Sequence, residues 1–174
     1  MSDYLTCSTQ AVADLAAILH NIPECAAYAD EIAAAACDVR PQDSTRFGLL
    51  IAAVGQIETQ WGRVRGHAAS TGPSIIGYDG HGRGLMQIDD RYHHIDGWDD
   101  PATNIAAGAR ILDAGLSTFA GNLAAGVACY NCGPGNVMHS LSEDPRDPDR
   151  FTTGKDYSRR VLSYYSRWLR LVVP

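Results

Sequence analysis

Residues 47–62 read FGLLIAAVGQIETQWG, and the rest of the chain can be arranged around this segment. Its apolar residues recur at the i, i+3, i+4, i+7 spacing of a helix with one buried face. That face carries Phe47, Leu50, Ile51, Val54, Ile57 and Trp61. Glu58 lies on the same face, so we expect loss of water to raise its pKa and hold it protonated, as a general acid requires. The alternative is a Glu58 at the edge of the face, where it reaches solvent or an arginine.

The overall composition favours one soluble globular domain over residues 1–174. The chain is 45% hydrophobic and 20% charged, and its length suffices for a sizeable core. A net charge of −6 argues against nucleic acid as a partner. No apolar run is long enough to span a bilayer. The N-terminal sequence MSDYLTCSTQ has no basic or apolar signal region, so we expect either synthesis as a cytosolic protein or an exported form that has been trimmed and restarted at Met1.

The five cysteines form no recognisable disulfide framework. Cys25 falls on the apolar face of a predicted helix, where we expect a buried free thiol. Cys129 and Cys132 have C-x-x-C spacing, but ACYNCG resembles a helix end rather than a redox loop. No second Cys/His pair completes a zinc site. We therefore expect no metal and no cofactor.

Residues 1–42 are predicted to form a helical scaffold. Ser8 or Thr9 can cap a first helix, and Pro23 suits the opening turn of a second helix that stops at Pro41. Residues 43–174 would then form the catalytic core, beginning with the helix that carries Glu58.

The segment after this helix changes composition. Residues 63–84 are rich in Gly, Ser and His, which predicts a loop with a short hairpin around residues 75–78. Asp100 starts another helix, whose Gly108 and Gly115 share an apolar side and predict close packing against the Glu58 helix.

The C-terminal third is also predicted to be helical. A helix over residues 122–141 is interrupted at residues 133–135, and a Pro- and Asp-rich surface loop follows that could act as a mobile lid. Asp156 then caps a final helix. With no internal repeat or linker, the chain is predicted to be mostly α, with a small β-element.

Three aspartates are candidates for chemistry. Asp79 stands between glycines in GYDGHG, and Asp89 and Asp90 end MQIDD. A protonated carboxyl facing ionised carboxylates is the arrangement that cleaves glycosidic bonds. Solvated loop charges are the alternative, because Asp favours turns. Tyr130 and Asn131 pair an aromatic ring with an amide, which suits sugar binding or an ordinary helix terminus.

Several blocks in order resemble the goose-type lysozyme and soluble lytic transglycosylase family, which cleaves peptidoglycan. The resemblance covers about residues 47–168 and rests on IETQWG, GRGLMQIDDRYHHIDG, NIAAGARIL, ACYNCGPGNV and DYSRRVLSYY. It implies an α+β lysozyme-like fold, with a hairpin or short three-stranded element beside the groove. It implies that Glu58 is the general acid and that Asp89 and Asp79 position water. The residues expected to bind the glycan are Gln87, Tyr130, Asn131, Tyr157 and Asp90.

The sequence also departs from the family pattern. Thr59 stands where Ser is usual, and cysteines flank Tyr130 and Asn131 in place of small alanines. The N-terminal disulfides and signal peptide of the secreted vertebrate members are not evident. This combination resembles a bacteriophage endolysin or a bacterial wall-remodelling protein. The resemblance implies synthesis in the bacterial cytoplasm without a visible signal peptide, and action at the cell wall or periplasm after release.

The expected activity is that of a muramidase that hydrolyses peptidoglycan glycan strands with inversion, because Asp79 and Asp89 can hold a water. A lytic transglycosylase giving 1,6-anhydro products and a non-catalytic wall-binding module are the alternatives. We expect a monomer. Arg159, Arg160, Arg167 and Arg170 give the last helix a basic face, which either contacts anionic membrane or lipopolysaccharide or is simply solvated.

Overall fold

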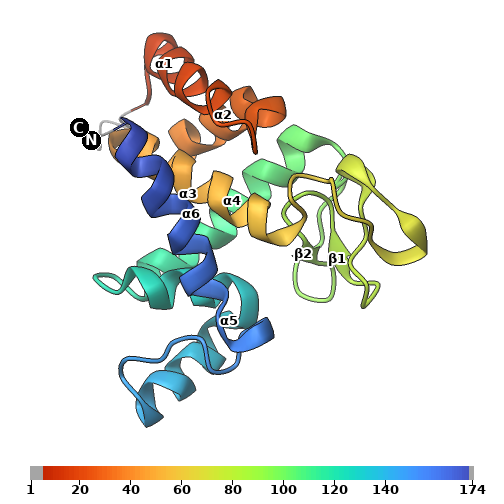
Figure 1. Cartoon of the computed structure of the whole chain (residues 1–174), viewed down its shortest axis with the longest axis vertical. Coiled ribbons are helices and arrows are strands. Elements are labelled where there is room, and N and C mark those ends of the chain that lie inside the picture. Colours follow the sequence, from red (N-terminus) through yellow and green to blue (C-terminus); the bar gives the residue numbers. More distant parts are fainter. Residues whose placement is uncertain (1–5, 173–174) are drawn as a thin grey trace.

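The computed structural model describes residues 6–172 and confirms the expected mostly helical fold class. Within that range the structure has six α-helices and one small antiparallel sheet (Figure 1). The helices are α1 (Thr9–His20), α2 (Ala29–Val39), α3 (Ser44–Glu58), α4 (Pro101–Thr118), α5 (Leu123–Glu143) and α6 (Tyr157–Val172). The strands are β1 (Gly82–Arg83) and β2 (Ile88–Asp89).

Helix α3 is the centre of the molecule, with α2, α4 and α6 packed around it (Figure 1). Every residue from Phe47 to Gln56 is buried, so the helix is enclosed on all sides and not along a single face. Small residues make this possible: Leu15 of α1 lies against Gly48, and the Trp61 ring lies against Gly55. Burial of this many apolar side chains is the main stabilising contribution to the fold.

The helix ends at Glu58, three residues before Trp61, the last residue of the predicted apolar face. Gln60 and Trp61 both have positive φ angles, and so does Gly62, which turns the chain sharply. The Trp61 indole folds back onto Gly55 and donates a hydrogen bond to the Ala52 carbonyl. Trp61 is therefore buried as predicted, but as part of the turn. Two adjacent non-glycine residues in the left-handed region are a conformation that folded proteins maintain mainly at functional sites.

The N-terminal region differs from the prediction in two respects. Ser8 caps α1 as expected, but α2 begins at Ala29, because the chain after Pro23 first forms turns and a short 3-10 helix. A disulfide joins Cys7 to Cys37, although the sequence suggested no framework. The two cysteines are 30 residues apart in a pattern that has no spacing signature. Cys25 is buried and free, as predicted.

The β-hairpin lies later in the chain than residues 75–78. Gly82 pairs with Asp89 and Arg83 pairs with Ile88, while Ile76 contributes only an isolated bridge to Arg83. The glycine-rich sequence had hidden the strands, because two-residue strands carry no periodic signal.

Helices α4 and α5 begin as predicted, with Asp100 capping α4 and Asn122 capping α5, and α5 is interrupted at Gly133. The two glycines of α4 do not face α3. Gly108 makes room for Met86, and Gly115 approaches the Gly126 carbonyl of α5. The close helix approach that the glycines predicted is therefore made with α5.

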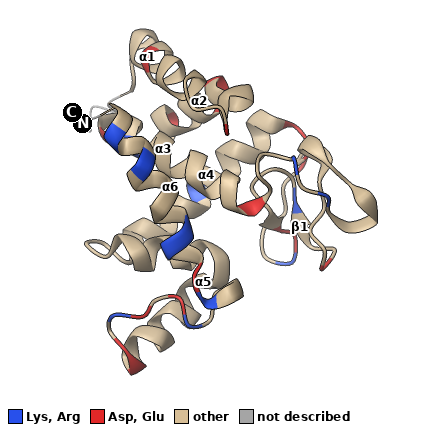
Figure 2. Cartoon of the chain, in the orientation of Figure 1, with Lys and Arg blue, Asp and Glu red and all other residues tan. Residues whose placement is uncertain are grey.

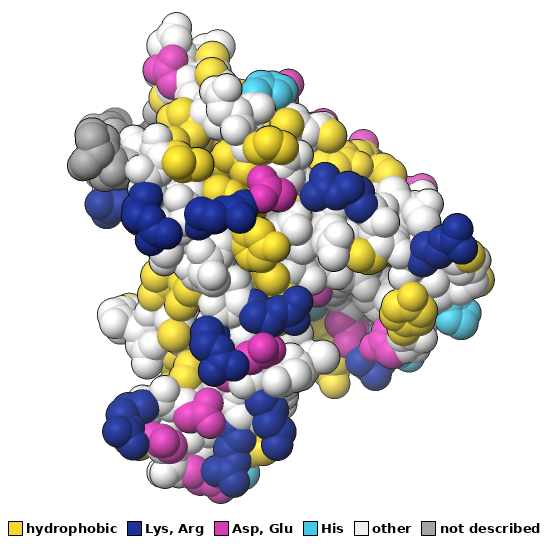
Figure 3. All heavy atoms as spheres, in the orientation of Figure 1, with side chains coloured by type: hydrophobic (Ala, Val, Ile, Leu, Met, Phe, Trp, Pro, Cys, Tyr) yellow, Lys and Arg dark blue, Asp and Glu magenta, His cyan; other side chains and the backbone are white. Residues whose placement is uncertain are grey.

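Helix α6 crosses α3 and buries its apolar side, including Val161 and Trp168. Its arginines are exposed; Figure 2 shows basic positions along the ribbon of the helix, and Figure 3 shows basic side chains on the surface of this face. No helix within residues 6–172 combines the length and apolar character needed to cross a membrane. Most of the apolar half of this amphipathic helix is already used in the core, with Leu171 as an exposed exception, so a partner would meet mainly its charged side.

Candidate active site

Glu58 is the last residue of α3, and its carboxyl contacts a tyrosine from another helix. The hydroxyl of Tyr157, at the start of α6, donates a hydrogen bond to Glu58 Oε1 at a distance of 2.5 Å. Burial raises the pKa of Tyr130 of α5, and the nearby charge of Glu58 raises it further. Burial raises the pKa of Glu58 to about 7, although the Tyr157 hydrogen bond and the charge of Arg160 act in the opposite direction. Glu58 can thus hold a proton at neutral pH and still release it, which is what a general acid must do.

Three helices hold the turn of the β-hairpin beside Glu58. The hydroxyl of Thr59 donates to the Leu85 carbonyl at 2.8 Å and accepts from the Gly62 amide. The hydroxyl of Tyr130 donates to the Met86 carbonyl at 2.7 Å. These bonds fix the hairpin against the C-terminal end of α3 and the middle of α5, and Thr59 uses the hydroxyl that it shares with the Ser of the resembled motif.

Asn104 of α4 makes the third of these attachments, and the sequence analysis missed its role. Its Oδ1 accepts from the Met86 amide at 2.8 Å, and its Nδ2 donates to the Arg83 carbonyl at 3.1 Å. The side chain is 1% exposed. The asparagine of NIAAGARIL was the available signal, but nothing local marks it as a contact to a turn 18 residues earlier in the chain.

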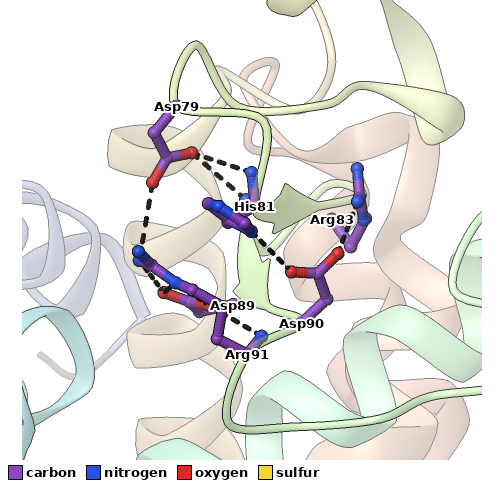
Figure 4. A network of polar contacts seen from close by, with 7 residues as sticks. Asp79, His81, Arg83, Asp89, Asp90 and Arg91 are labelled. Atoms are coloured by element: carbon purple, nitrogen blue, oxygen red, sulfur yellow. Dashed lines mark hydrogen bonds and ion pairs between the residues drawn. The ribbon is translucent and has the colours of Figure 1, made fainter.

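Asp89 lies at the end of β2 and is paired with Arg91 (Figure 4). The arginine engages both carboxylate oxygens, through Nε at 2.9 Å to Oδ1 and through Nη2 at 2.5 Å to Oδ2. These contacts hold the pKa of Asp89 below its usual value. Asp89 is therefore ionised wherever Glu58 is protonated near neutrality, but its lone pairs are largely occupied.

Asp79 lies in the loop above Asp89 (Figure 4), and the same arginine reaches it at 3.7 Å. Its Oδ1 accepts from the amides of His81 and Gly82, which lowers the pKa of the carboxyl. Its Oδ2 is engaged only by the more distant Arg91 contact. Of the two aspartates, Asp79 thus keeps the more accessible oxygen.

Asp90 points to a different set of partners from Asp89. It pairs with Arg83 and with Nδ1 of His81, and it borders a cavity of about 420 Å³ that Ile88 and Trp98 also line. The nearest ligand atoms of His81, Asp89 and Asp90 lie within 4.8 Å of one another. Arginines already compensate both carboxylates, so we assign no metal to this cluster.

The remaining predicted residues are held by the protein itself. Gln87 has a φ of +48° and donates to the Gly84 carbonyl, and its side chain fills the space left by Gly77 and Gly82. Asn131 accepts from the Thr153 amide at 2.8 Å. Tyr157, expected along the saccharide groove, is 3% exposed and directs its hydroxyl at Glu58.

The structure thus brings Glu58, Tyr130 and Tyr157 together, and separately Asp79, Asp89 and Arg91, with the hairpin turn joining the two groups. A family model described as the transglycosylase SLT domain matches residues 50–151, which is more than half of the chain. The match contains Glu58, the hairpin and Tyr130, and it ends before α6.

Proposed function

The chain belongs to the transglycosylase SLT domain family, and from this membership we propose that it cleaves the glycan strands of peptidoglycan. The bond is the β-1,4 linkage between N-acetylmuramic acid and N-acetylglucosamine. Glu58 is the general acid that protonates the leaving glycosidic oxygen, after which positive charge develops on the muramic acid ring.

One observation carries this proposal: the Glu58 carboxyl lies at the end of a helix that is buried from Phe47 to Gln56, and it is contacted by Tyr157, with its pKa raised to about 7. A solvated glutamate would be ionised at neutral pH and could not donate a proton. Desolvation keeps the proton, and the Tyr157 hydroxyl stabilises the carboxylate once the proton has left.

We favour hydrolysis with inversion over a lytic transglycosylase reaction. In this route a water attacks the anomeric carbon from the side opposite the leaving group, and an ionised aspartate accepts the proton of that water. Asp79 is the better placed of the two candidates, because its Oδ2 is the less occupied oxygen. Asp89 then orients Arg91, which in turn holds the Asp79 loop.

A lytic transglycosylase is the second candidate, and the Arg91 contacts favour it. Because Arg91 occupies both oxygens of Asp89, this carboxylate is a weak base for water. In the transglycosylase route the 6-hydroxyl of the muramic acid attacks its own anomeric carbon, and the Glu58 carboxylate takes back the hydroxyl proton. The family's description also names this reaction.

Mass spectrometry of the products separates the two routes. Purified peptidoglycan is digested in water enriched in ¹⁸O, with the wild type and with Asp79→Asn. Hydrolysis puts the heavy oxygen on the new reducing end, and Asp79→Asn abolishes that product. Anhydro-muropeptides without heavy oxygen as the main product would replace the hydrolase by the transglycosylase. Binding to peptidoglycan without any cleavage by the wild type would leave a wall-binding module.

We further propose that the protein acts at the cell wall or in the periplasm, as an endolysin released from the cytoplasm would. The Cys7–Cys37 disulfide supports this, because such bonds persist in oxidising compartments. The exposed arginines of α6 would contact anionic lipid or lipopolysaccharide by charge alone. Charge reversal at Arg170 should then reduce lysis of intact cells more than digestion of purified wall.

A further inference from the structure

Asp149 is a buried carboxylate in the loop between α5 and α6. It is 6% exposed and accepts two hydrogen bonds from Ser158, through the amide at 2.8 Å and the hydroxyl at 2.8 Å. The Arg159 amide donates a longer bond of 3.3 Å, and the Thr152 hydroxyl donates another. A carboxylate that accepts from the first free amides of a helix satisfies their hydrogen bonds and complements the helix dipole.

This cap was predicted to be Asp156, the residue directly before α6. Asp156 accepts from the Arg160 amide with its backbone carbonyl, and its carboxylate pairs with the Arg159 side chain at 3.7 Å rather than with a free helix amide. The Asp149 carboxylate reaches the helix amides from outside the local sequence. Other hydrogen bonds also hold this loop, which the sequence suggested as a possible lid, against α5. Ser140 of α5 donates to the Asp147 carbonyl, and Asn131 accepts from the Thr153 amide.

This cap fixes the position of Tyr157, the first residue of α6. Its amide donates to the Thr152 hydroxyl, which itself donates to the Asp149 carbonyl, and Ser158 follows it in the chain. Tyr157 then extends its own hydroxyl to Glu58. The direction of the Tyr157 ring is thus set by the same turn that Asp149 holds.

We propose that Asp149 is a positioning residue for the Glu58 acid, acting through the first turn of α6 and Tyr157. The inference rests on the proposed function, since it assigns Asp149 to the same site. Removing the Asp149 carboxylate should loosen the Tyr157 hydroxyl from Glu58. Because that hydroxyl stabilises ionised Glu58, its loss makes Glu58 harder to deprotonate.

The neighbouring charges allow this route to be distinguished from a direct electrostatic effect. The groups that face Glu58 are Tyr157 and Arg160 of α6 and Tyr130 of α5. Asp149 faces the start of α6 and the Cys132 thiol of α5. Removing a negative charge that acted on Glu58 through space would lower the pKa of Glu58. Loss of positioning would raise it.

The experiment measures the pKa of Glu58 directly by NMR, with ¹³C at the glutamate carboxyl. The chain has only four glutamates, Glu24, Glu31, Glu58 and Glu143, and the spectrum of Glu58→Gln assigns the signal. The variants are Asp149→Asn, Tyr157→Phe and the double variant. Ser8→Ala removes a helix cap from α1, which carries no site residue, and serves as the matched control.

We expect the Glu58 pKa to rise by about half a pH unit in both single variants, the size of one modest hydrogen bond. The double variant should rise no further than Tyr157→Phe, and Ser8→Ala should leave the pKa unchanged. An unchanged or lowered pKa in Asp149→Asn, or additive rises in the double variant, would overturn the proposal. If Asp149→Asn does not fold, Ser158→Ala, which removes one bond to Asp149, gives the same comparison.

A kinetic readout separates failure of this inference from failure of the proposed function. At a pH below the Glu58 pKa, where the acid is protonated in both proteins, Asp149→Asn should lower kcat on purified peptidoglycan more than it changes KM, because the acid then gives up its proton less readily. Should Glu58→Gln remain active, the proposed function fails, whatever the NMR titration shows. Should Glu58→Gln be inactive while Asp149→Asn keeps the wild-type pKa and kcat, only the positioning role fails.

Discussion

The hydroxyl of Tyr157 donates a hydrogen bond to the carboxyl of Glu58, although 99 residues separate them in the chain. Glu58 ends the central helix, and Tyr157 begins the last one. The family match ends at residue 151, so the matched segment contains the acid but lacks this partner. The protonation behaviour of the site therefore depends on the docking of α6 as well as on the motif around Glu58.

Replacing Tyr157 with Phe should extend activity to higher pH. Wild-type cleavage is expected to fall as the pH passes through about 7, because Glu58 then loses the proton that it must donate. Tyr157→Phe removes a group that stabilises ionised Glu58, so the fall should occur at a higher pH. Rates measured on purified peptidoglycan between about pH 5 and pH 9 give the comparison. A decline of the variant's activity at a lower pH than in the wild type would contradict this role of Tyr157.

The two hydroxyl-bearing residues possible at position 59 should behave alike. Thr59→Ser keeps the bonds to Leu85 and Gly62 and should retain near wild-type activity. Thr59→Val keeps the shape but leaves both backbone groups without a partner, at a cost of about 1–3 kcal/mol of stability. Thermal unfolding and wall digestion of both variants test this. Equal behaviour of Ser and Val would show that the hydroxyl does not hold the hairpin.

The sequence predicted the central helix, the cap of α1, the starts of α4 and α5 and the break at Gly133, because each has a local cause in periodicity, capping or glycine geometry. It did not predict the end of α3 at Glu58, since the reversal at Gln60 and Trp61 depends on the Trp61 ring packing onto Gly55.

The candidate site also combines features with a local cause in the sequence and features that depend on tertiary contacts. The carboxylates were recognisable from their motifs, whereas their partners were not. Asn104 holds a turn from another helix, Arg91 pairs with Asp89 and Asp79, and Asp149 caps α6 from a distant loop. These are tertiary contacts, and neither propensity nor spacing in a single sequence encodes them.

Neutralising Arg91 should move the acid side of the pH profile. Arg91→Met keeps most of the apolar stem but removes the contact that does most to lower the pKa of Asp89. The pKa of Asp79 should rise less, because the His81 amide is its main stabilising contact. If these aspartates act ionised, activity should begin to fall at a higher pH on the acid side. Arg110→Met breaks an exposed pair with Asp38 and is the matched control; an identical profile for both variants would remove Arg91 from the site.

Ionisation of Glu58 should lower the free energy of unfolding of the protein. Its pKa is about 7 in the folded protein and 4.5 when unperturbed. The folded state therefore binds the proton more tightly, and stability declines as the pH rises from the unfolded to the folded pKa. Replacing Glu58 with Gln removes a penalty of at most about 3 kcal/mol. Chemical denaturation should find the variant more stable than the wild type above the folded pKa, with the gain lost at low pH; no gain at alkaline pH would mean that Glu58 is not desolvated.

The most direct test of the account is the rate at which Glu58→Gln releases soluble fragments from purified peptidoglycan, measured beside its near-UV circular dichroism spectrum. We predict a loss of roughly 10²- to 10⁴-fold, the usual contribution of a general acid, with a spectrum that matches the wild type. A correctly folded Glu58→Gln protein that digests the wall at close to the wild-type rate would contradict the assignment of Glu58 as the acid.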